Sequence, residues 1–192
     1  MELITWYLEQ GDVAQVRPGR EPAVPVEVRR AELPSPELNR FLYTAVGGDW
    51  FWTDRLAWAW PQWQDWLSAP GVETWVASVR GTPAGYAELD GRRPGEVEIA
   101  YFGLLPQFAG QGIGGHLLTE VLRRAWDLAG RWPHQTAISR VWVHTCSLDG
   151  PAALANYRAR GLTVYRTEVT SAADGAAAPG PWPGAQRPAT GA

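Results

Sequence analysis

Apolar and polar residues alternate in short runs over much of the first half of the chain, a pattern typical of strands. The pattern predicts strands over Val26–Ala31, Glu73–Arg80, Pro83–Asp90 and Glu96–Leu105. The last three are joined by short turns, so we expect them to be antiparallel. Between the first two strands, Ser35 is typical of a helix N-cap with Pro36 at the first position, and this helix is expected to end near Val46. A second helix is predicted over Pro61–Leu67.

From Ile113 the period changes to that of a helix. Apolar residues then recur at Leu117, Leu118, Val121, Leu122, Ala125, Leu128 and Ala129. A strand over Ile138–Thr145 follows, then a helix from about Pro151 to Arg160 that ends at Gly161, and a final strand over Leu162–Glu168. We therefore expect an α/β (α+β) fold with a mixed, mainly antiparallel central sheet and helices on both faces.

A length of 192 residues is enough for one domain with a substantial core. We expect this domain to span residues 1–170, with its core in residues 26–169 and a linker at Gln15–Pro25. Ser171–Ala192 consists mainly of Ala, Gly and Pro and has few large apolar residues. Such a segment buries too little surface to offset its ordering entropy, so we expect a disordered tail.

Charge and cysteine content exclude several classes of function. The formal net charge is −3, and no run of Lys or Arg indicates a nucleic-acid surface. Cys146 is the single cysteine, and the three histidines lack a metal-binding spacing. No apolar stretch reaches the roughly 18–20 residues of a membrane helix, and the N-terminus does not have the pattern of a signal peptide. We expect a cytoplasmic protein without a metal, a membrane or a nucleic acid as partner.

A glycine-rich segment connects the strand that ends at Leu105 to the helix that begins at Ile113. Residues 110–115 read Gly-Gln-Gly-Ile-Gly-Gly. Without side chains, backbone N–H groups can approach an anion closely, and a helix N-terminus adds unpaired donors and a positive dipole end. The segment therefore predicts a phosphate site that needs no basic side chain.

Two common phosphate motifs fit this segment poorly. Gly110, Gly112 and Gly115 match G-x-G-x-x-G, but the preceding strands are expected to be antiparallel, and no acidic residue follows at the distance that a dinucleotide site requires. A P-loop needs Lys and Ser or Thr where His116 and Leu117 stand.

The segment instead resembles the acetyl-coenzyme A (acetyl-CoA) motif [QR]-x-x-G-x-[GA] of the GNAT superfamily of N-acetyltransferases. Gly112 and Gly114 occupy its two small-residue positions. Ala109 stands where Gln or Arg is usual, which removes one side-chain contact that Gln107 or Gln111 could replace.

A second segment, Ala153–Leu162, is similar to the late A-x-x-x-Y-x-x-x-G-F pattern of the same superfamily, with Leu162 in place of Phe. The resemblance covers about residues 26–168 and the order of the predicted elements. It implies acyl transfer from acetyl-CoA to an amine. The cofactor contacts that it implies are Leu104, Leu105, Ala109, Gly110, Gln111, Gly112, Ile113, Gly114 and Gly115.

The resemblance also implies where the chemistry takes place. It places the thioester beside a splay in the sheet, where the N–H of Leu104 or Leu105 would bond the acyl carbonyl. Tyr157 would protonate the leaving thiolate, or it is a packing residue. Glu98 is a candidate base, because a carboxylate among apolar neighbours tends toward a raised pKa, although it also fits a strand edge that faces water. His144 is a further candidate base or a structural histidine.

Seven of the twelve tryptophans lie between Trp50 and Trp75. In the GNAT superfamily the region after the first helix usually helps to form the acceptor side. Aromatic faces hold apolar groups or cations, and Asp49 or Asp54 could hold an ammonium group. Trp50, Trp52, Asp54 and Glu88 are therefore candidate acceptor residues. Trp58, Trp60, Trp63 and Trp66 are expected to be mainly core residues.

The leading hypothesis is an N-acetyltransferase that acts directly on the primary amine of a small molecule. Two alternatives stay open: a non-catalytic domain that binds or senses acyl-CoA, and an enzyme that modifies a protein N-terminus or lysine. The sequence also leaves open a homodimer, the acyl chain length and the identity of the acceptor.

Overall fold

The computed structural model describes residues 2–132, 135–171, 178–183 and 185. Within these residues, seven strands form one sheet in the order β2-β3-β4-β5-β6-β1-β7. Neighbouring strands are antiparallel except for the parallel pair β5 and β6. This confirms the expected mixed, mainly antiparallel sheet. The strands are β1 (Glu2–Gln10), β2 (Glu27–Ala31), β3 (Val72–Val79), β4 (Thr82–Asp90), β5 (Glu96–Leu104), β6 (Arg140–Cys146) and β7 (Thr163–Ser171).

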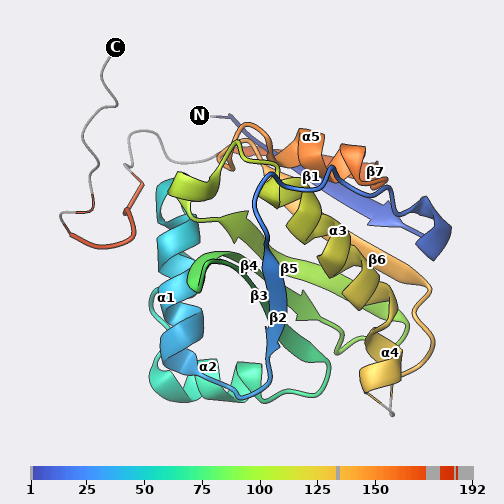
Figure 1. Ribbon diagram of the computed structural model, residues 1–192, viewed down its shortest axis with the longest axis horizontal. Coiled ribbons are helices and arrows are strands. Elements are labelled where there is room, and N and C mark those ends of the chain that lie inside the picture. The colour runs from blue at the N-terminus through green and yellow to red at the C-terminus, as the bar shows by residue number, and fades with distance from the viewer. Residues whose placement is uncertain (1, 133–134, 172–177, 184, 186–192) are drawn as a thin grey trace.

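Helices cover both faces of the sheet, and α3 runs across its front in Figure 1. Ser35 caps the first helix as expected, since its side chain accepts from the N–H of Leu38. The α-helices are α1 (Pro36–Gly47), α2 (Trp60–Leu67), α3 (Ile113–Trp126), α4 (Leu128–Arg131) and α5 (Ala153–Ala159). Short 3-10 turns are η1 (Val13–Gln15), η2 (Gly48–Trp50) and η3 (Pro106–Phe108).

The two faces of β4 show how strand alternation builds two cores. Ala87 and Leu89 are fully buried in the larger core, which includes the apolar stripe of α3. Tyr86 points to the opposite face and packs against Leu42 and Val46 of α1. The period of two in this strand therefore separates an α3 side from an α1 side.

The N-terminal strand β1 is the element that the sequence pattern did not predict. It lies between β6 and β7 and is antiparallel to both. Leu8 of β1 is fully buried among the residues that also surround α3. The core therefore extends beyond the expected limits of residues 26–169.

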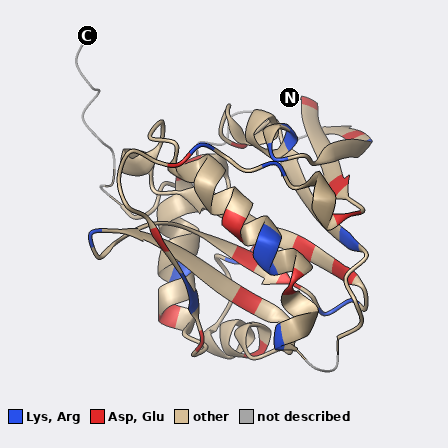
Figure 2. Cartoon of the chain, turned by 45° about the vertical axis from the view of Figure 1, so that its right-hand side comes forward, with Lys and Arg blue, Asp and Glu red and all other residues tan. Residues whose placement is uncertain are grey.

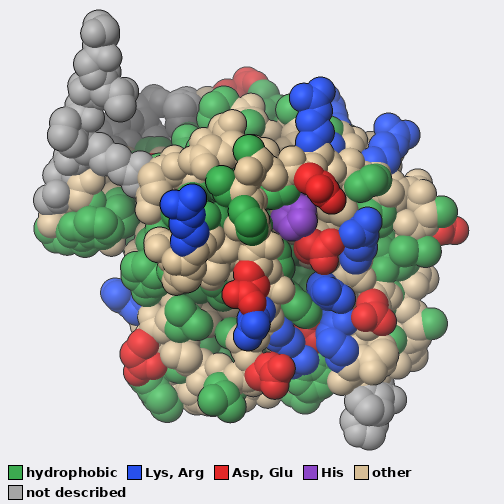
Figure 3. All heavy atoms as spheres, in the orientation of Figure 1, with side chains coloured by type: hydrophobic (Ala, Val, Ile, Leu, Met, Phe, Trp, Pro, Cys, Tyr) green, Lys and Arg blue, Asp and Glu red, His purple; other side chains and the backbone are tan. Residues whose placement is uncertain are grey.

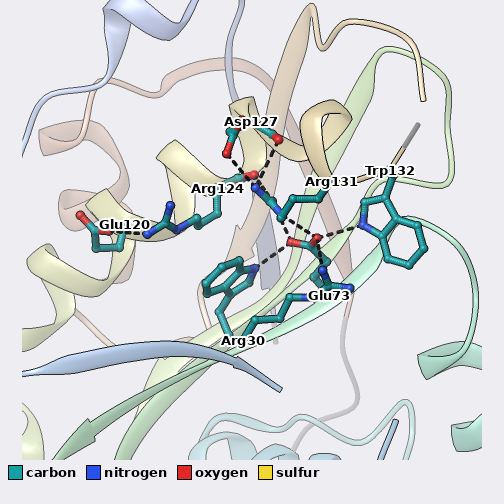
Figure 4. A network of polar contacts seen from close by, with 8 residues as sticks. Arg30, Glu73, Glu120, Arg124, Asp127, Arg131 and Trp132 are labelled. Carbon is teal, nitrogen blue, oxygen red and sulfur yellow. Dashed lines mark hydrogen bonds and ion pairs between the residues drawn. The ribbon is translucent and has the colours of Figure 1, made fainter. Parts of the chain in front are cut away.

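A polar network anchors α4 to β3 (Figure 4). The Glu73 side chain is fully buried and accepts hydrogen bonds from Arg131 at 2.8 Å and from the indole nitrogens of Trp75 and Trp132 at 2.9 Å. Arg30 of β2 approaches the same carboxylate at 3.3 Å. Burial by itself raises the pKa of Glu73, but the Arg131 and Trp75 hydrogen bonds lower it below its usual value. These contacts hold together segments that lie far apart in the sequence.

The expected tail falls largely on residues 172–177, 184 and 186–192, which lie outside the described residues. Ser171, which we expected to begin that tail, is the last residue of β7 and pairs with Glu2. Gly180 donates its backbone N–H to the carbonyl oxygen of Gly48 at 3.0 Å. Among the described residues, no helix has the length and apolar character that crossing a membrane requires.

Candidate functional site

The strands β5 and β6 separate part-way along their length. Their parallel register joins three pairs of residues and ends at Glu98 opposite Trp142, although β5 continues to Leu104. The register of β5 with β4 also shifts, so that Ala100 is an extra residue on β5. The sheet thus has the expected splay, and a cavity of about 1290 Å³ lies there.

This cavity connects two regions that differ in chemistry. Its walls include the glycine turn before α3, the α5 residues Asn156 and Tyr157, and the side chains of Trp50, Trp52, Asp54, Glu98 and His144. One continuous space therefore joins the glycine turn to a group of carboxylate, imidazole and aromatic side chains. The described residues hold no group of three or more His, Cys, Asp or Glu side chains that could bind a metal ion.

The glycine turn presents open backbone to its surroundings. Gly110 and Gly112 have φ angles of +77° and +80°, the left-handed region that favours glycine. An added Cβ at Gly110 would meet no atom within 4 Å, and one at Gly112 would meet only Pro22, at 3.7 Å. No side chain caps α3, and its first turn contains no acidic residue. The first N–H groups of the helix are therefore suited to hold a diphosphate.

The structure brings two of the candidate bases into contact. Nδ1 of His144 lies 3.2 Å from Oε1 of Glu98. The hydrogen bond to Glu98 raises the pKa of His144, the charge of Glu98 adds to this, and burial opposes it. Because Nδ1 donates to the carboxylate, the neutral ring has its lone pair on Nε2. The imidazole is half exposed, whereas the Glu98 side chain is 22% exposed.

Tyr157 lies on α5 in the wall of the same cavity. Its side chain is buried, and its ring centroid is 5.9 Å from that of Phe102 on β5. Burial raises the pKa of Tyr157 well above its usual range, and the charge of Asp149 adds to this effect. The phenol is therefore protonated at neutral pH.

Comparison with known protein families identifies the fold. A family model described as the acetyltransferase (GNAT) family matches residues 37–162. The chain belongs to the GNAT family. Acetyl-CoA is the acyl donor of this family, and the open glycine turn fits the diphosphate of such a donor. No curated protein matches the chain.

Solved structures similar to this GNAT chain show the same fold at low sequence identity. A GCN5-related N-acetyltransferase from Kribbella flavida is 17% identical with a TM-score of 0.60, over 86% of this chain and 56% of that one. A GCN5-related N-acetyltransferase from Sphaerobacter thermophilus is 16% identical with a TM-score of 0.57, over 87% of this chain and 50% of that one. A tandem GNAT protein from the clavulanic acid biosynthesis pathway is 13% identical with a TM-score of 0.54, over 89% and 55%. The chain therefore spans about half the length of these proteins.

Most of the residues expected at the donor end of this GNAT cavity line it. They are Leu104, Ala109, Gly110, Gly112, Gly114 and Gly115. The prediction that the N–H of Leu105 could bond the acyl carbonyl is wrong, because this N–H already donates to the carbonyl oxygen of Ala84 at 2.8 Å. The Gln111 amide folds back onto the carbonyl oxygen of Gln107 at 2.8 Å, and the Ile113 side chain is fully buried. Gln111 and Ile113 can therefore offer a ligand their backbone rather than their side chains.

Of the candidate acceptor residues, Trp50, Trp52 and Asp54 line the cavity, whereas Asp49 lies exposed in η2. The prediction that Glu88 is an acceptor residue is wrong. The Glu88 side chain is 1% exposed and accepts from Arg55 at 2.6 Å, from Trp66 at 2.7 Å and from Asn39 at 3.2 Å. These bonds direct the carboxylate into the protein, so Glu88 does not face an acceptor.

Arg55 explains much of the tryptophan cluster, and we did not predict its role. Its guanidinium lies 4.3–5.7 Å from the ring centroids of Trp58, Trp63, Trp66 and Tyr101. This aromatic cage is thus filled by a cation of the chain itself. The sequence signal was an arginine inside a tryptophan-rich segment. Trp63 is buried as expected, but Trp60 is 55% exposed and donates to Glu37.

Proposed function

We propose that this chain transfers an acetyl group from acetyl-CoA directly to the primary amine of a small molecule. The observation that carries this proposal is the continuous cavity between the glycine turn and the Glu98–His144 pair. Membership of the GNAT family identifies acetyl-CoA as the acyl donor, and the cavity is a single space that can hold donor and acceptor together. Direct transfer needs no acyl-enzyme intermediate.

The donor half of the proposal rests on the turn before α3. The N–H groups at Gly110–Gly115 bind the diphosphate of acetyl-CoA, since the turn is open and no side chain caps the helix. Acetyl-CoA supplies an activated acyl group when bound. The splay beyond Glu98 gives the acyl end a path between β5 and β6.

His144 acts as the general base in this proposal, and Glu98 positions it. The acceptor nitrogen must lose a proton as it bonds to the acyl carbon. Nε2 of His144 accepts that proton, while Glu98 fixes the ring through Nδ1 and stabilises the imidazolium. This division of roles uses both candidate bases, one at the reacting atom and one behind it.

Tyr157 provides the proton for the sulfur as the carbon–sulfur bond breaks. The raised pKa keeps its hydroxyl protonated until negative charge develops beside it. Its place on α5 puts it in the wall of the cavity near the glycine turn. The acceptor becomes an amide, His144 holds the amine proton, and CoA leaves as the thiol.

A small amine fits the acceptor end better than a nucleic acid does. Indole rings of Trp50, Trp52 and Trp142 and the carboxylates of Asp54 and Glu98 line the cavity. Arg92 and Arg93 line it as well, and Arg92 is paired with Asp90 at 2.9 Å. Flat apolar walls with acidic groups favour a compact cation. Acidic positions also recur along the strands of the sheet in Figure 2, and charges of both signs are interspersed on the face in Figure 3.

The test is turnover of acetyl-CoA against a library of small amines and short peptides, read as release of free thiol. We expect turnover with a small amine and its loss in His144→Gln. Turnover with peptides alone would instead identify a protein acetyltransferase. Tight CoA binding without any turnover would favour a non-catalytic acyl-CoA-binding domain.

A further inference from the structure

Arg160 directly follows Ala159, the last residue of α5. Its side chain extends to the first turn of α3. An added Cβ at Gly115 would lie 2.6 Å from Nη1 of Arg160, so the guanidinium packs directly against the backbone of Gly115. An added Cβ at Gly19 would lie 3.1 Å from the same nitrogen. The guanidinium therefore occupies a slot between two glycines, beside the turn that faces the cavity.

The slot gives Arg160 little compensation for its charge. Its Nε is buried without a hydrogen-bond partner among the described residues. Nη1 donates to Oδ1 of Asn156 at 3.4 Å, which is long for a hydrogen bond. A guanidinium has five N–H donors, so this contact satisfies only one of them. No carboxylate of the residues that the structure describes forms an ion pair with Arg160.

The position is also unfavourable for a cation by itself. The N-terminus of a helix carries partial positive charge, so it attracts anions and repels a guanidinium. The first turn of α3 contains no acidic side chain that would offset this. A bound anion would satisfy the helix terminus and Arg160 together.

We propose that Arg160 is a phosphate-binding residue of the acetyl-CoA site, pairing with one of the phosphate groups of the cofactor at the first turn of α3. This inference rests on the proposed function, which places acetyl-CoA at the glycine turn. It also accounts for Ala109, which has no polar side chain at the motif position where Gln or Arg is usual. Arg160 supplies from α5 the side-chain contact that the motif lacks.

The test is isothermal titration of the full chain with CoA and with 3′-dephospho-CoA. Arg160→Gln removes the charge but keeps the backbone carbonyl that accepts from Arg17 and Gln10. Arg158→Gln is the matched control, because Arg158 is exposed on the same helix. We expect Arg160→Gln to weaken CoA binding about tenfold or more, as for loss of a charge-assisted hydrogen bond, and Arg158→Gln to bind like the wild type.

The two ligands identify the phosphate. If Arg160 binds the 3′-phosphate, the wild type prefers CoA to 3′-dephospho-CoA and Arg160→Gln loses that preference. If it binds the diphosphate, Arg160→Gln weakens both ligands equally. Arg160→Lys, which keeps the charge, should show an intermediate loss and serves also if the Gln variant does not fold.

Two results would overturn the inference in distinguishable ways. Wild-type affinity in folded Arg160→Gln or Arg160→Lys would show that Arg160 is structural, while the donor site itself stands. Absence of CoA binding by the wild type would remove the donor site of the proposed function and the role of Arg160 with it.

Discussion

Replacing Glu88 with Gln removes a buried negative charge while almost preserving the size of the side chain. Glu88 and Arg55 are 1% and 6% exposed, and Arg55 lies in the wall of the cavity. Breaking a buried ion pair by removing one partner costs about 3–5 kcal/mol. Gln keeps one carbonyl oxygen for Trp66 or Arg55, and the indole rings still face the guanidinium, so we expect the lower limit, about 3 kcal/mol. For a chain of this length that loss lowers the melting temperature by about 6–12 °C.

Urea unfolding followed by tryptophan fluorescence and by circular dichroism measures this change in the free energy of unfolding. Glu27→Gln is the matched control, because Glu27 pairs with Arg29 on β2 and both side chains are more than half exposed. Exposed pairs contribute about 0–1 kcal/mol, so the control should barely change the unfolding midpoint. Equal, small losses in both variants would refute the view that Glu88 neutralises Arg55 in the cage.

Three further predictions concern the chemistry. In Glu98→Gln the pKa of His144 should fall, because the hydrogen bond and charge of the carboxylate raise it. Since the base acts when unprotonated, the acidic limb of the pH profile of kcat/KM should move to lower pH. An unmoved limb would exclude His144 as the titrating base. Tyr157→Phe should reduce the single-turnover rate about 10²-fold or more with little change in CoA affinity; a near wild-type rate would make the tyrosine structural. Gly112→Val places a branched side chain at φ +80°, so CoA binding should be lost while circular dichroism reports a folded protein; unchanged affinity would contradict the donor site.

Local features of the fold were predictable because they depend on neighbouring residues. Ser35 and Pro36 specify the start of α1 through capping, and Gly161, expected to end α5, has a φ of +93°. The strand β1 was not predictable in the same way. Its residues pair with β6 and β7, more than 130 positions away, so its place in the sheet depends on contacts that no local pattern contains.

The proposed catalytic pair shows a similar limit. Glu98 and His144 were both named from the sequence, yet their contact follows from the parallel register that sets Glu98 opposite Trp142. His144 is two positions beyond Trp142, so it faces the same side of the sheet. A shift of one residue would turn the imidazole to the α3 side and separate the two groups. The residue types were readable from the sequence, whereas the register was not.

Glu88 and Glu98 look alike in the sequence as glutamates on apolar strands, and the structure gives them different partners. What separates them is the partner: Arg55 reaches Glu88 from the loop before α2, whereas His144 reaches Glu98 from β6. A guanidinium stays charged at every relevant pH, so the first pair is fixed and belongs to the framework. An imidazole changes charge near neutrality, so the second pair can exchange a proton with a substrate. The identity of the cation beside each carboxylate therefore assigns one glutamate to stability and the other to the proposed chemistry.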